Sequence, residues 1–197
     1  MRARLAIQSS GIKVQLREIV LSDKAPTFLV CSPKGTVPVV VTKNDVIEDS
    51  LDIMRWALTT RDPEGWLQMP YEGHEWIARN DGPFKDALDH TKYSVRYPNL
   101  DSSLERKKAG NFLDDLNTQI ASSPWMFGKK CSLADMAIIP FVRQFSYIDN
   151  HWFDAQGWQN VDRWLTAFLD SDKFNTIMTR YDKWITGDPD ILFPNQP

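Results

Sequence analysis

The most constraining feature of this sequence is a change of pattern close to residue 60. Before that point, short apolar runs alternate with helical stretches, which is typical of an α/β domain. After it, apolar side chains recur every three or four residues, the spacing that places them on one face of a helix. Pro63 and Gly65 lie where the pattern changes. We therefore predict an α/β domain over residues 1–60, a linker over 61–72 and an all-helical domain over 73–197.

The predicted first domain combines short strands with two helices. Gly11 follows the first helical stretch, as expected at a helix C-terminus, and residues 43–45 form a turn between two strands. Residues 24–31 are expected to be a short helix or an irregular segment. The predicted helices are 2–10 and 49–59, and the predicted strands are 13–20, 38–42 and 45–47.

The stretch from Val37 to Ser50 gives the clearest indication of function. Val37 precedes Pro38, which favours extended backbone and lets the Val37 N–H and C=O pair with a bound peptide. Asp49 and Ser50 open a helix whose first N–H groups lack intrahelical partners and whose dipole is positive there. We interpret Asp49 as a partner for an ammonium group, and Ser50 with the free N–H groups as partners for a carboxylate. The alternative is that Val-Pro is only a turn and Asp-Ser only a helix cap.

A second local motif indicates structure rather than chemistry. Ser132 and Asp135 are spaced as a capping box, in which each side chain accepts a hydrogen bond from the other residue's N–H. Cys131 and Met136 lie at positions that suit a hydrophobic contact across this helix start. We predict that a helix begins here and that loss of the Ser132 hydroxyl costs about 1 kcal/mol.

Composition argues against several classes of protein. A net charge of −3, with no basic stripe, argues against nucleic acids and acidic membranes as partners. Two cysteines, Cys31 and Cys131, do not make a disulfide scaffold, and three scattered histidines indicate no metal site. No apolar run approaches the roughly 20 residues that span a bilayer, and the start does not resemble a signal peptide. We expect a cytoplasmic protein.

Taken together, these residues resemble the cytosolic glutathione S-transferase superfamily, and within it the bacterial, omega-like members that use a cysteine. The resemblance implies a thioredoxin-like α/β domain followed by an all-helical domain. It also implies a homodimer, glutathione as cosubstrate and a small hydrophobic electrophile as the second substrate. The features that carry the resemblance are the helix from Arg2 to Gly11, the Val37-Pro38 bend, the Asp49-Ser50 pair, the helical second domain and the capped helix at Ser132 to Asp135.

The resemblance also implies roles for five residues. Val37 corresponds to the residue whose main chain pairs with the cysteinyl part of glutathione, and Pro38 to the cis proline that shapes the bend. Asp49 and Ser50 correspond to the residues that hold the γ-glutamyl end. Lys24 corresponds to a basic residue near the glycyl carboxylate, the alternative being a solvated surface lysine.

Part of the family pattern is expected to be missing. Relatives of this type begin with a strand and a Cys-Pro turn ahead of the helix that here starts at Arg2. We therefore expect the first strand and the nucleophilic cysteine to be absent from this sequence. Arg2 and Arg4, which crowd the positive end of the helix dipole, agree with that expectation.

No residue of the sequence is predicted to replace the missing nucleophile. Cys31 is expected to be a buried, inert thiol and Cys131 a packing residue, while Ser9 and Ser10 lie at the negative end of their helix. We predict no catalytic residue, and weak or absent thiol transfer by this chain. Two functions remain open: a glutathione transferase whose full-length form acts on small electrophiles, or a non-catalytic binding or interaction module of the same fold.

Overall fold

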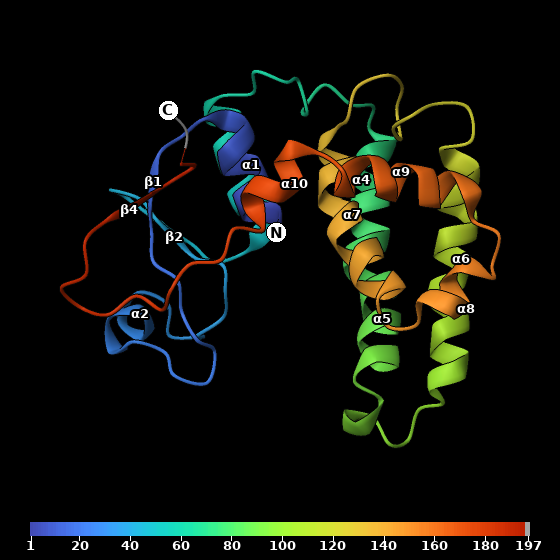
Figure 1. The fold of residues 1–197 in the computed structure, drawn as a ribbon, viewed down its shortest axis with the longest axis horizontal. Helices are drawn as coiled ribbons and strands as arrows, with labels where there is room; N and C mark the ends of the chain where they lie inside the picture. Colours follow the sequence, from blue (N-terminus) through green and yellow to red (C-terminus); the bar gives the residue numbers. More distant parts are fainter. Residues whose placement is uncertain (196–197) are drawn as a thin grey trace. The chain divides into compact units, whose positions relative to one another are not determined.

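The computed structural model describes residues 1–195, and its contacts divide the chain into two compact units (Figure 1). The first unit contains residues 1–65 and the C-terminal segment from residue 172 onward. The second unit contains residues 66–171. The first combines helices with short strands and the second is helical, which confirms the predicted fold class. The C-terminal segment, predicted as part of the helical domain, differs from that expectation because it packs with the first unit.

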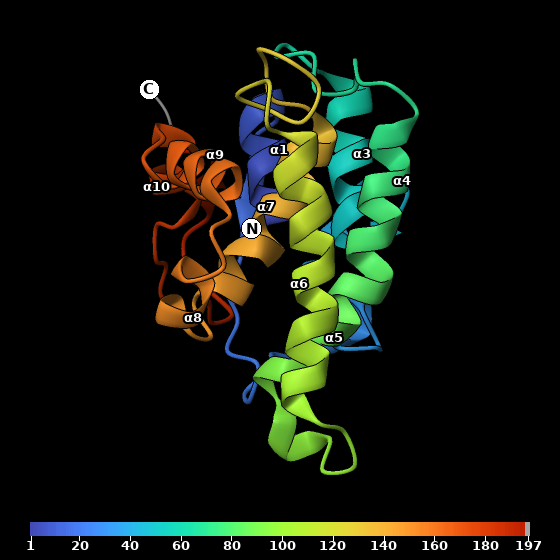
Figure 2. The ribbon, with the colours of Figure 1, turned by 90° about the vertical axis from the view of Figure 1, so that its right-hand side faces the viewer.

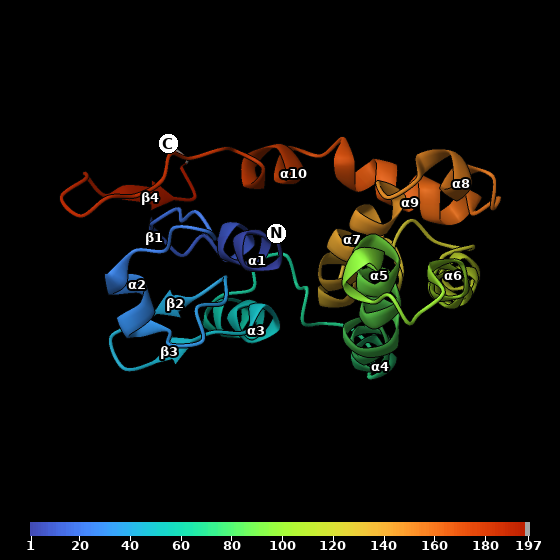
Figure 3. The same cartoon turned by 90° about the horizontal axis from the view of Figure 1, so that it is seen from below.

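Helices form the core of the first unit. Helix α1 (Arg2–Ser10) packs against α3 (Ser50–Thr60) and α10 (Asp172–Ile177). As predicted, α1 ends at Gly11, whose φ of 69° is in the left-handed region. The pairing of α1 and α3 is seen end-on in Figure 3. Side chains with no exposed surface at this contact are Leu5, Ala6, Ile53, Met54 and Ala57.

Four short strands form two separate antiparallel pairs in the first unit (Figure 3). Strand β1 (Val14–Leu16) pairs with β4 (Ile191–Phe193), so the chain's two ends share a sheet. Strand β2 (Val40–Val41) pairs with β3 (Val46–Ile47), with Val40 opposite Ile47. Within residues 1–195, no strand pairing joins the two sheets. Helix α2 (Pro26–Cys31) forms within the predicted segment 24–31.

The strands are shorter than predicted because their backbone groups find other partners. The predicted strand 13–20 ends at Leu16, since the Glu18 carbonyl accepts the Trp184 N–H at 2.9 Å. The predicted strand 38–42 starts at Val40, as Pro38 has no N–H to donate to a ladder. It ends in a turn in which the Thr42 N–H donates to the Asp45 carbonyl at 2.8 Å.

Long-range hydrogen bonds hold the C-terminal segment against the first unit. The Arg4 guanidinium donates to the carbonyls of Ile177 and Thr179, at 3.1 Å each. Lys13 Nζ donates to the Pro194 carbonyl at 2.5 Å. These contacts, together with the β1–β4 pairing, explain why residues after α10 do not continue as helix.

The second unit is a set of helices, seen face-on in Figure 2. Its first helical stretch is interrupted at Gly82-Pro83 by a π-helical turn with Pro83 inside it. Trp66 lies in the predicted linker but is fully buried in this unit, where its carbonyl accepts the Leu133 N–H at 2.8 Å. The helices are α4 (Glu72–Arg79), η1 (Asn80–Phe84), α5 (Lys85–Lys92), η2 (Ser94–Arg96), α6 (Ser102–Gln119), α7 (Leu133–Ser146), α8 (Asn150–Asp154) and α9 (Gln159–Leu169).

The predicted capping box starts α7 and is confirmed. Asp135 is fully buried and its carboxylate accepts hydrogen bonds from the Ser132 N–H and hydroxyl, at 2.8 and 2.7 Å. The same carboxylate accepts the Met126 N–H at 2.9 Å and the Trp164 indole N–H at 2.8 Å. Burial raises the pKa of Asp135, and these four hydrogen bonds oppose that rise. One buried side chain thus joins a loop, α7 and α9.

Candidate functional site

The Val37-Pro38 peptide bond is cis, as the family resemblance implied. Val37 itself is 45% exposed. Within residues 1–195, its backbone N–H and C=O take part in no hydrogen bond. A peptide laid beside Val37 can therefore pair with both groups, in the manner of an added strand.

A tight turn leads the chain to Val37. The Gly35 N–H donates to the Ser32 carbonyl at 2.9 Å, and the φ of Gly35 is 63°. Glycine adopts this left-handed conformation without strain. A Cβ on Gly35 would lie 3.3 Å from Leu29 and 3.4 Å from the Lys24 ammonium nitrogen. Lys24, a predicted site residue, therefore lies against the turn that carries Val37.

The N-terminus of α3 differs in one respect from the sequence prediction. Asp49 is its N-cap, and one carboxylate oxygen, Oδ1, accepts the Leu51 and Asp52 N–H groups at 2.7 and 3.2 Å. Two amides that were expected to be free for a ligand are thus occupied by the protein, because the exposed cap carboxylate lies closer to them than any other group. Across the described chain, Asp49 Oδ2 and the Ser50 hydroxyl and N–H have no hydrogen-bond partner.

The hairpin brings Val37 and Asp49 to the same end. Because Val40 lies opposite Ile47, the residues just before β2 and just after β3 are adjacent across the hairpin. Pro38 stands two residues before Val40, and Asp49 two residues after Ile47. The four residues predicted along this stretch, Val37, Pro38, Asp49 and Ser50, are therefore gathered in one part of the first unit.

The structure adds three residues that the sequence reasoning missed. Ser32 Oγ donates to Glu48 Oε1 at 2.6 Å, and Lys34 Nζ lies 3.4 Å from Glu48 Oε2. We call Ser32, Lys34 and Glu48 the clasp. The hydrogen bond from Ser32, and then the contact with Lys34, hold the pKa of Glu48 below its ordinary value. The only sequence signal for the clasp was a second acid directly before Asp49.

Two charged side chains of the first unit, Asp49 and Lys24, are available to a ligand. Both oxygens of Glu48 have partners within the clasp, so Asp49, with one oxygen unpaired, is the carboxylate available to an ammonium group. Lys24 makes no hydrogen bond or ion pair with any residue between 1 and 195, so its ammonium is available to a carboxylate. A ligand with an ammonium at one end and a carboxylate at the other is complementary to this arrangement.

The two candidate serines end α1, as the sequence predicted, but the expectation that Cys31 is a buried thiol is wrong, because α2 has no buried residue. Cys31 is exposed at the last residue of α2 and Cys131 is half-buried. The Ser9 hydroxyl donates to Glu64 at 2.9 Å, and the Ser10 hydroxyl donates to the Ile7 carbonyl at 2.9 Å. Both hydroxyls therefore serve the packing of α1.

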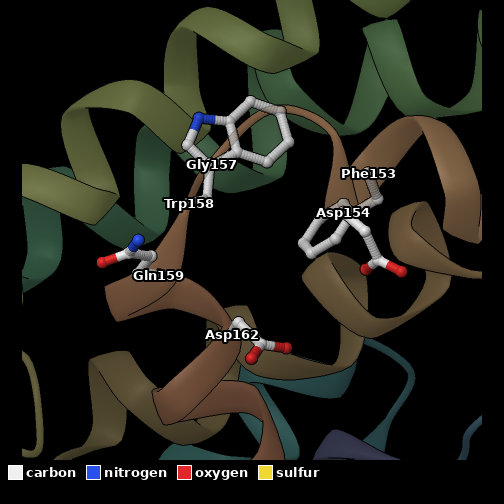
Figure 4. A pocket seen from close by; sticks show the side chains of 6 residues that line it. All are labelled: Phe153, Asp154, Gly157, Trp158, Gln159 and Asp162. Carbon is white, nitrogen blue, oxygen red and sulfur yellow. The ribbon is translucent and has the colours of Figure 1, made fainter.

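A pocket of about 360 Å³ lies in the second unit between α8 and α9 (Figure 4). Its charged groups are the carboxylates of Asp154 and Asp162, and no cationic residue lines it. Such a pocket repels a ligand with two carboxylates. The lining residues are Phe153, Asp154, Gly157, Trp158, Gln159 and Asp162.

Neither a membrane-spanning helix nor a metal-binding cluster is found in the part of the chain that the structure describes. Over residues 1–195, no helix combines the length and apolar character that crossing a bilayer requires. The same residues contain no group of three or more His, Cys, Asp or Glu side chains arranged to hold a metal ion.

The sequence was compared with known proteins. It is 26% identical over 153 residues to probable glutathione S-transferase parA of Nicotiana tabacum, covering 74% of this chain and 67% of that protein. The chain spans 67%, 49% and 66% of the lengths of three curated relatives that it matches.

Two solved structures show the same fold. A crystal structure of poplar glutathione transferase F1, mutant Ser 13 Cys, aligns with a TM-score of 0.74 at 16% identity, over 89% of each chain. A glutathione transferase family member from Pseudomonas fluorescens, solved with two glutathione bound, aligns with a TM-score of 0.72 at 17% identity, over 87% of this chain and 84% of that one.

Family models match most of the chain. The model described as glutathione S-transferase, N-terminal domain, matches residues 1–65. The model described as glutathione S-transferase, C-terminal domain, matches residues 75–167. The chain belongs to the glutathione S-transferase superfamily, with a thioredoxin-like first domain and a helical second domain.

Proposed function

We propose that this protein binds glutathione in its first unit, along the loop that ends at Val37-Pro38 and against the N-terminus of α3. The observation that carries the proposal is a set of unpartnered groups gathered there among the described residues. These are the Val37 backbone, Asp49 Oδ2, the Ser50 hydroxyl and the Lys24 ammonium.

The chemistry of glutathione matches this set end to end. Its γ-glutamyl end carries an ammonium, which pairs with Asp49, and a carboxylate, which takes the Ser50 hydroxyl and N–H at the positive end of α3. The cysteinyl residue pairs with the Val37 main chain. The glycyl carboxylate meets Lys24. Asp49 thus has two roles, since it caps α3 with one oxygen and binds the ligand with the other.

The reaction that the family resemblance supports, for a full-length form, is glutathione-dependent thiol transfer to small electrophiles or their reduction by glutathione. This agrees with the glutathione transferase names of the relatives and with the glutathione in one structural neighbour. We further propose a cytoplasmic homodimer that takes a small hydrophobic second substrate. Light scattering of the purified protein would report the mass of the assembly.

Calorimetric titration with glutathione tests the binding proposal. Asp49→Asn is the sharpest variant, because asparagine keeps the helix cap but loses the charge. Its binding free energy for glutathione should be weaker by about 1.5 to 3 kcal/mol, and its free energy of unfolding should be almost unchanged. Asp49→Ala should weaken glutathione binding by the same amount, and it should also lower the free energy of unfolding by about 1 kcal/mol. Absence of binding to the parent protein, or equal affinity in Asp49→Asn, would overturn the proposal.

A rate measurement separates an enzyme from a binding module. The protein is mixed with glutathione and either a small aryl halide or a small mixed disulfide, and product is followed by absorbance. A rate above the uncatalysed reaction that falls in Asp49→Asn supports transferase activity at this site. Glutathione binding without any rate increase would leave a binding module as the function of this chain.

A further inference from the structure

The clasp connects two segments that each carry half of the proposed site. Ser32 begins the turn that leads to Val37, and Glu48 directly precedes Asp49 and Ser50. The hydroxyl–carboxylate distance between Ser32 and Glu48 is 2.6 Å. Ser32 has no exposed surface, so water does not compete strongly for this hydrogen bond.

Ser32 is also fixed by its own backbone. Its N–H donates to the Phe28 carbonyl at 2.9 Å and closes the end of α2. Its carbonyl accepts the Gly35 N–H at 2.9 Å and closes the turn. Its hydroxyl donates to Glu48, which precedes α3. Ser32 therefore makes hydrogen bonds to α2, to the turn before Val37 and to the segment that leads into α3.

The hairpin that connects the two halves is short. The connecting hairpin has only two paired residues in each strand, and an isolated two-stranded hairpin is at most marginally stable. Its loop residues Lys43, Asn44 and Asp45 are exposed or nearly so. The position of Val37 relative to Asp49 therefore depends on an additional link beyond the hairpin.

We infer that Glu48, held by Ser32 and Lys34, is a positioning residue that keeps Val37 and the Asp49-Ser50 pair at the spacing one tripeptide can bridge. The inference rests on the proposed glutathione site and adds the device that aligns its two halves. In this inference Glu48 is not a ligand-binding group, and each of its oxygens has a partner within the clasp. It acts through the segments that it joins.

Glutathione affinity measured on clasp variants tests this role. Ser32→Ala removes a hydrogen bond to a charged group, while Glu48→Gln makes that bond neutral and removes the ion pair with Lys34. Each substitution should weaken glutathione binding by about tenfold. Ser32→Thr keeps the hydroxyl and should stay within about twofold of the parent. Asp52→Asn, which alters an exposed carboxylate on the same first turn of α3, is the matched control and should also stay within about twofold.

A ligand that contacts only one half of the proposed site distinguishes misalignment of the two halves from distortion of the loop itself. S-methyl-cysteinylglycine has no γ-glutamyl end, so it can meet Val37 and Lys24 but not Asp49. Its affinity, measured by NMR titration, should change by less than about twofold in Ser32→Ala and Glu48→Gln, because it does not need both halves aligned. Equal losses for glutathione and S-methyl-cysteinylglycine would mean that the substitutions only damage the loop, and would overturn the inference.

Amide hydrogen exchange tests the clasp without any ligand. The Gly35 N–H reports the turn, and the Leu51 and Asp52 N–H groups report the start of α3. Exchange at both places should quicken together in Ser32→Ala and in Glu48→Gln, by about fivefold or more. If the Gly35 N–H exchanges at the parent rate in Glu48→Gln, the positioning role of Glu48 is overturned, even if the parent binds glutathione. Failure of the parent to bind glutathione would overturn the proposed function instead.

Discussion

Two helix starts in this protein each use an aspartate carboxylate, but in opposite ways. At α7, Asp135 and Ser132 are buried, and the Asp135 carboxylate accepts four hydrogen bonds from the protein. At α3, Asp49 is exposed and only one of its oxygens is used within the described chain. The first cap is complete without a ligand, whereas the second leaves an oxygen and a neighbouring hydroxyl for one.

The difference shows that burial decides whether a carboxylate is fully hydrogen-bonded within the protein or keeps an oxygen available to a ligand. A carboxylate removed from water must satisfy its hydrogen bonds within the protein, or the desolvation cost is not recovered. An exposed carboxylate can leave one oxygen to solvent at little cost and exchange that water for a ligand. The buried acid of the helical unit therefore serves structure, and the exposed acid of the α/β unit is the one that the proposed function assigns to recognition.

The largest predicted effect comes from removing the buried acid. Asp135→Ala should lower the free energy of unfolding by about 3 to 5 kcal/mol, because buried donors on Met126, Ser132 and Trp164 lose their acceptor. Asp49→Ala at the exposed cap should cost only about 1 kcal/mol. Urea denaturation measures both variants. Similar losses at the two caps would contradict the comparison.

If Asp135→Ala fails to fold, Ser132→Ala provides a milder version. It removes one donor to the carboxylate and one acceptor for the Asp135 N–H, and it should cost about 1 to 2 kcal/mol. Its glutathione affinity should equal that of the parent, since the second unit supplies no residue to the proposed tripeptide contacts.

The next effect concerns two glycines, one in each unit. Gly35→Ala should destabilise by about 1 to 2 kcal/mol, because its φ of 63° is in the left-handed region and the new Cβ would press on Leu29 and Lys24. Gly82→Ala is the control, since space is open around Gly82 and its backbone is helical. It should be neutral or slightly stabilising, by up to about 1 kcal/mol. Thermal unfolding of both variants would test the difference.

The sequence predicted features that depend on neighbouring residues. Gly11 ends α1 because only local backbone geometry is involved, and Ser132 with Asp135 caps α7 because both members lie within one turn. The Asp49-Ser50 helix start is likewise local and was predicted, whereas the cis Val37-Pro38 bond was expected only from the family resemblance.

Features that depend on distant partners were not predicted. The predicted strand 13–20 became three residues long because its partner is β4, which lies at the other end of the chain. The clasp joins Ser32 to Glu48, sixteen positions later, and no local pattern specifies that pairing. The sequence left open whether Asp49 is a ligand group or a simple helix cap, and the structure shows the cap, formed by one carboxylate oxygen.

A smaller effect is expected at the other end of the proposed ligand. Lys24→Ala should weaken glutathione binding by about 1 kcal/mol, and the loss should shrink at high salt, since the contact is a partly exposed ion pair. For γ-glutamylcysteine, which has no glycyl carboxylate, the same variant should bind like the parent. Lys34→Ala should have the weaker effect on glutathione, because Lys34 is engaged with Glu48. Calorimetry with the two ligands at two salt concentrations would separate these outcomes.

The smallest expected effect is a pH dependence of stability at the clasp. Ser32 first, and Lys34 second, lower the pKa of Glu48 below its ordinary value of 4.5, so the folded state favours the ionised carboxylate. The resulting stabilisation is complete well above pH 4.5 and is lost as the pH falls through the lowered pKa of the folded state. The difference in unfolding free energy between the parent and Glu48→Gln should therefore be constant near neutral pH and shrink in acid. Ser32→Ala should show the same trend, whereas a difference that stays constant down to about pH 3 would mean that Glu48 titrates alike in the folded and unfolded chains.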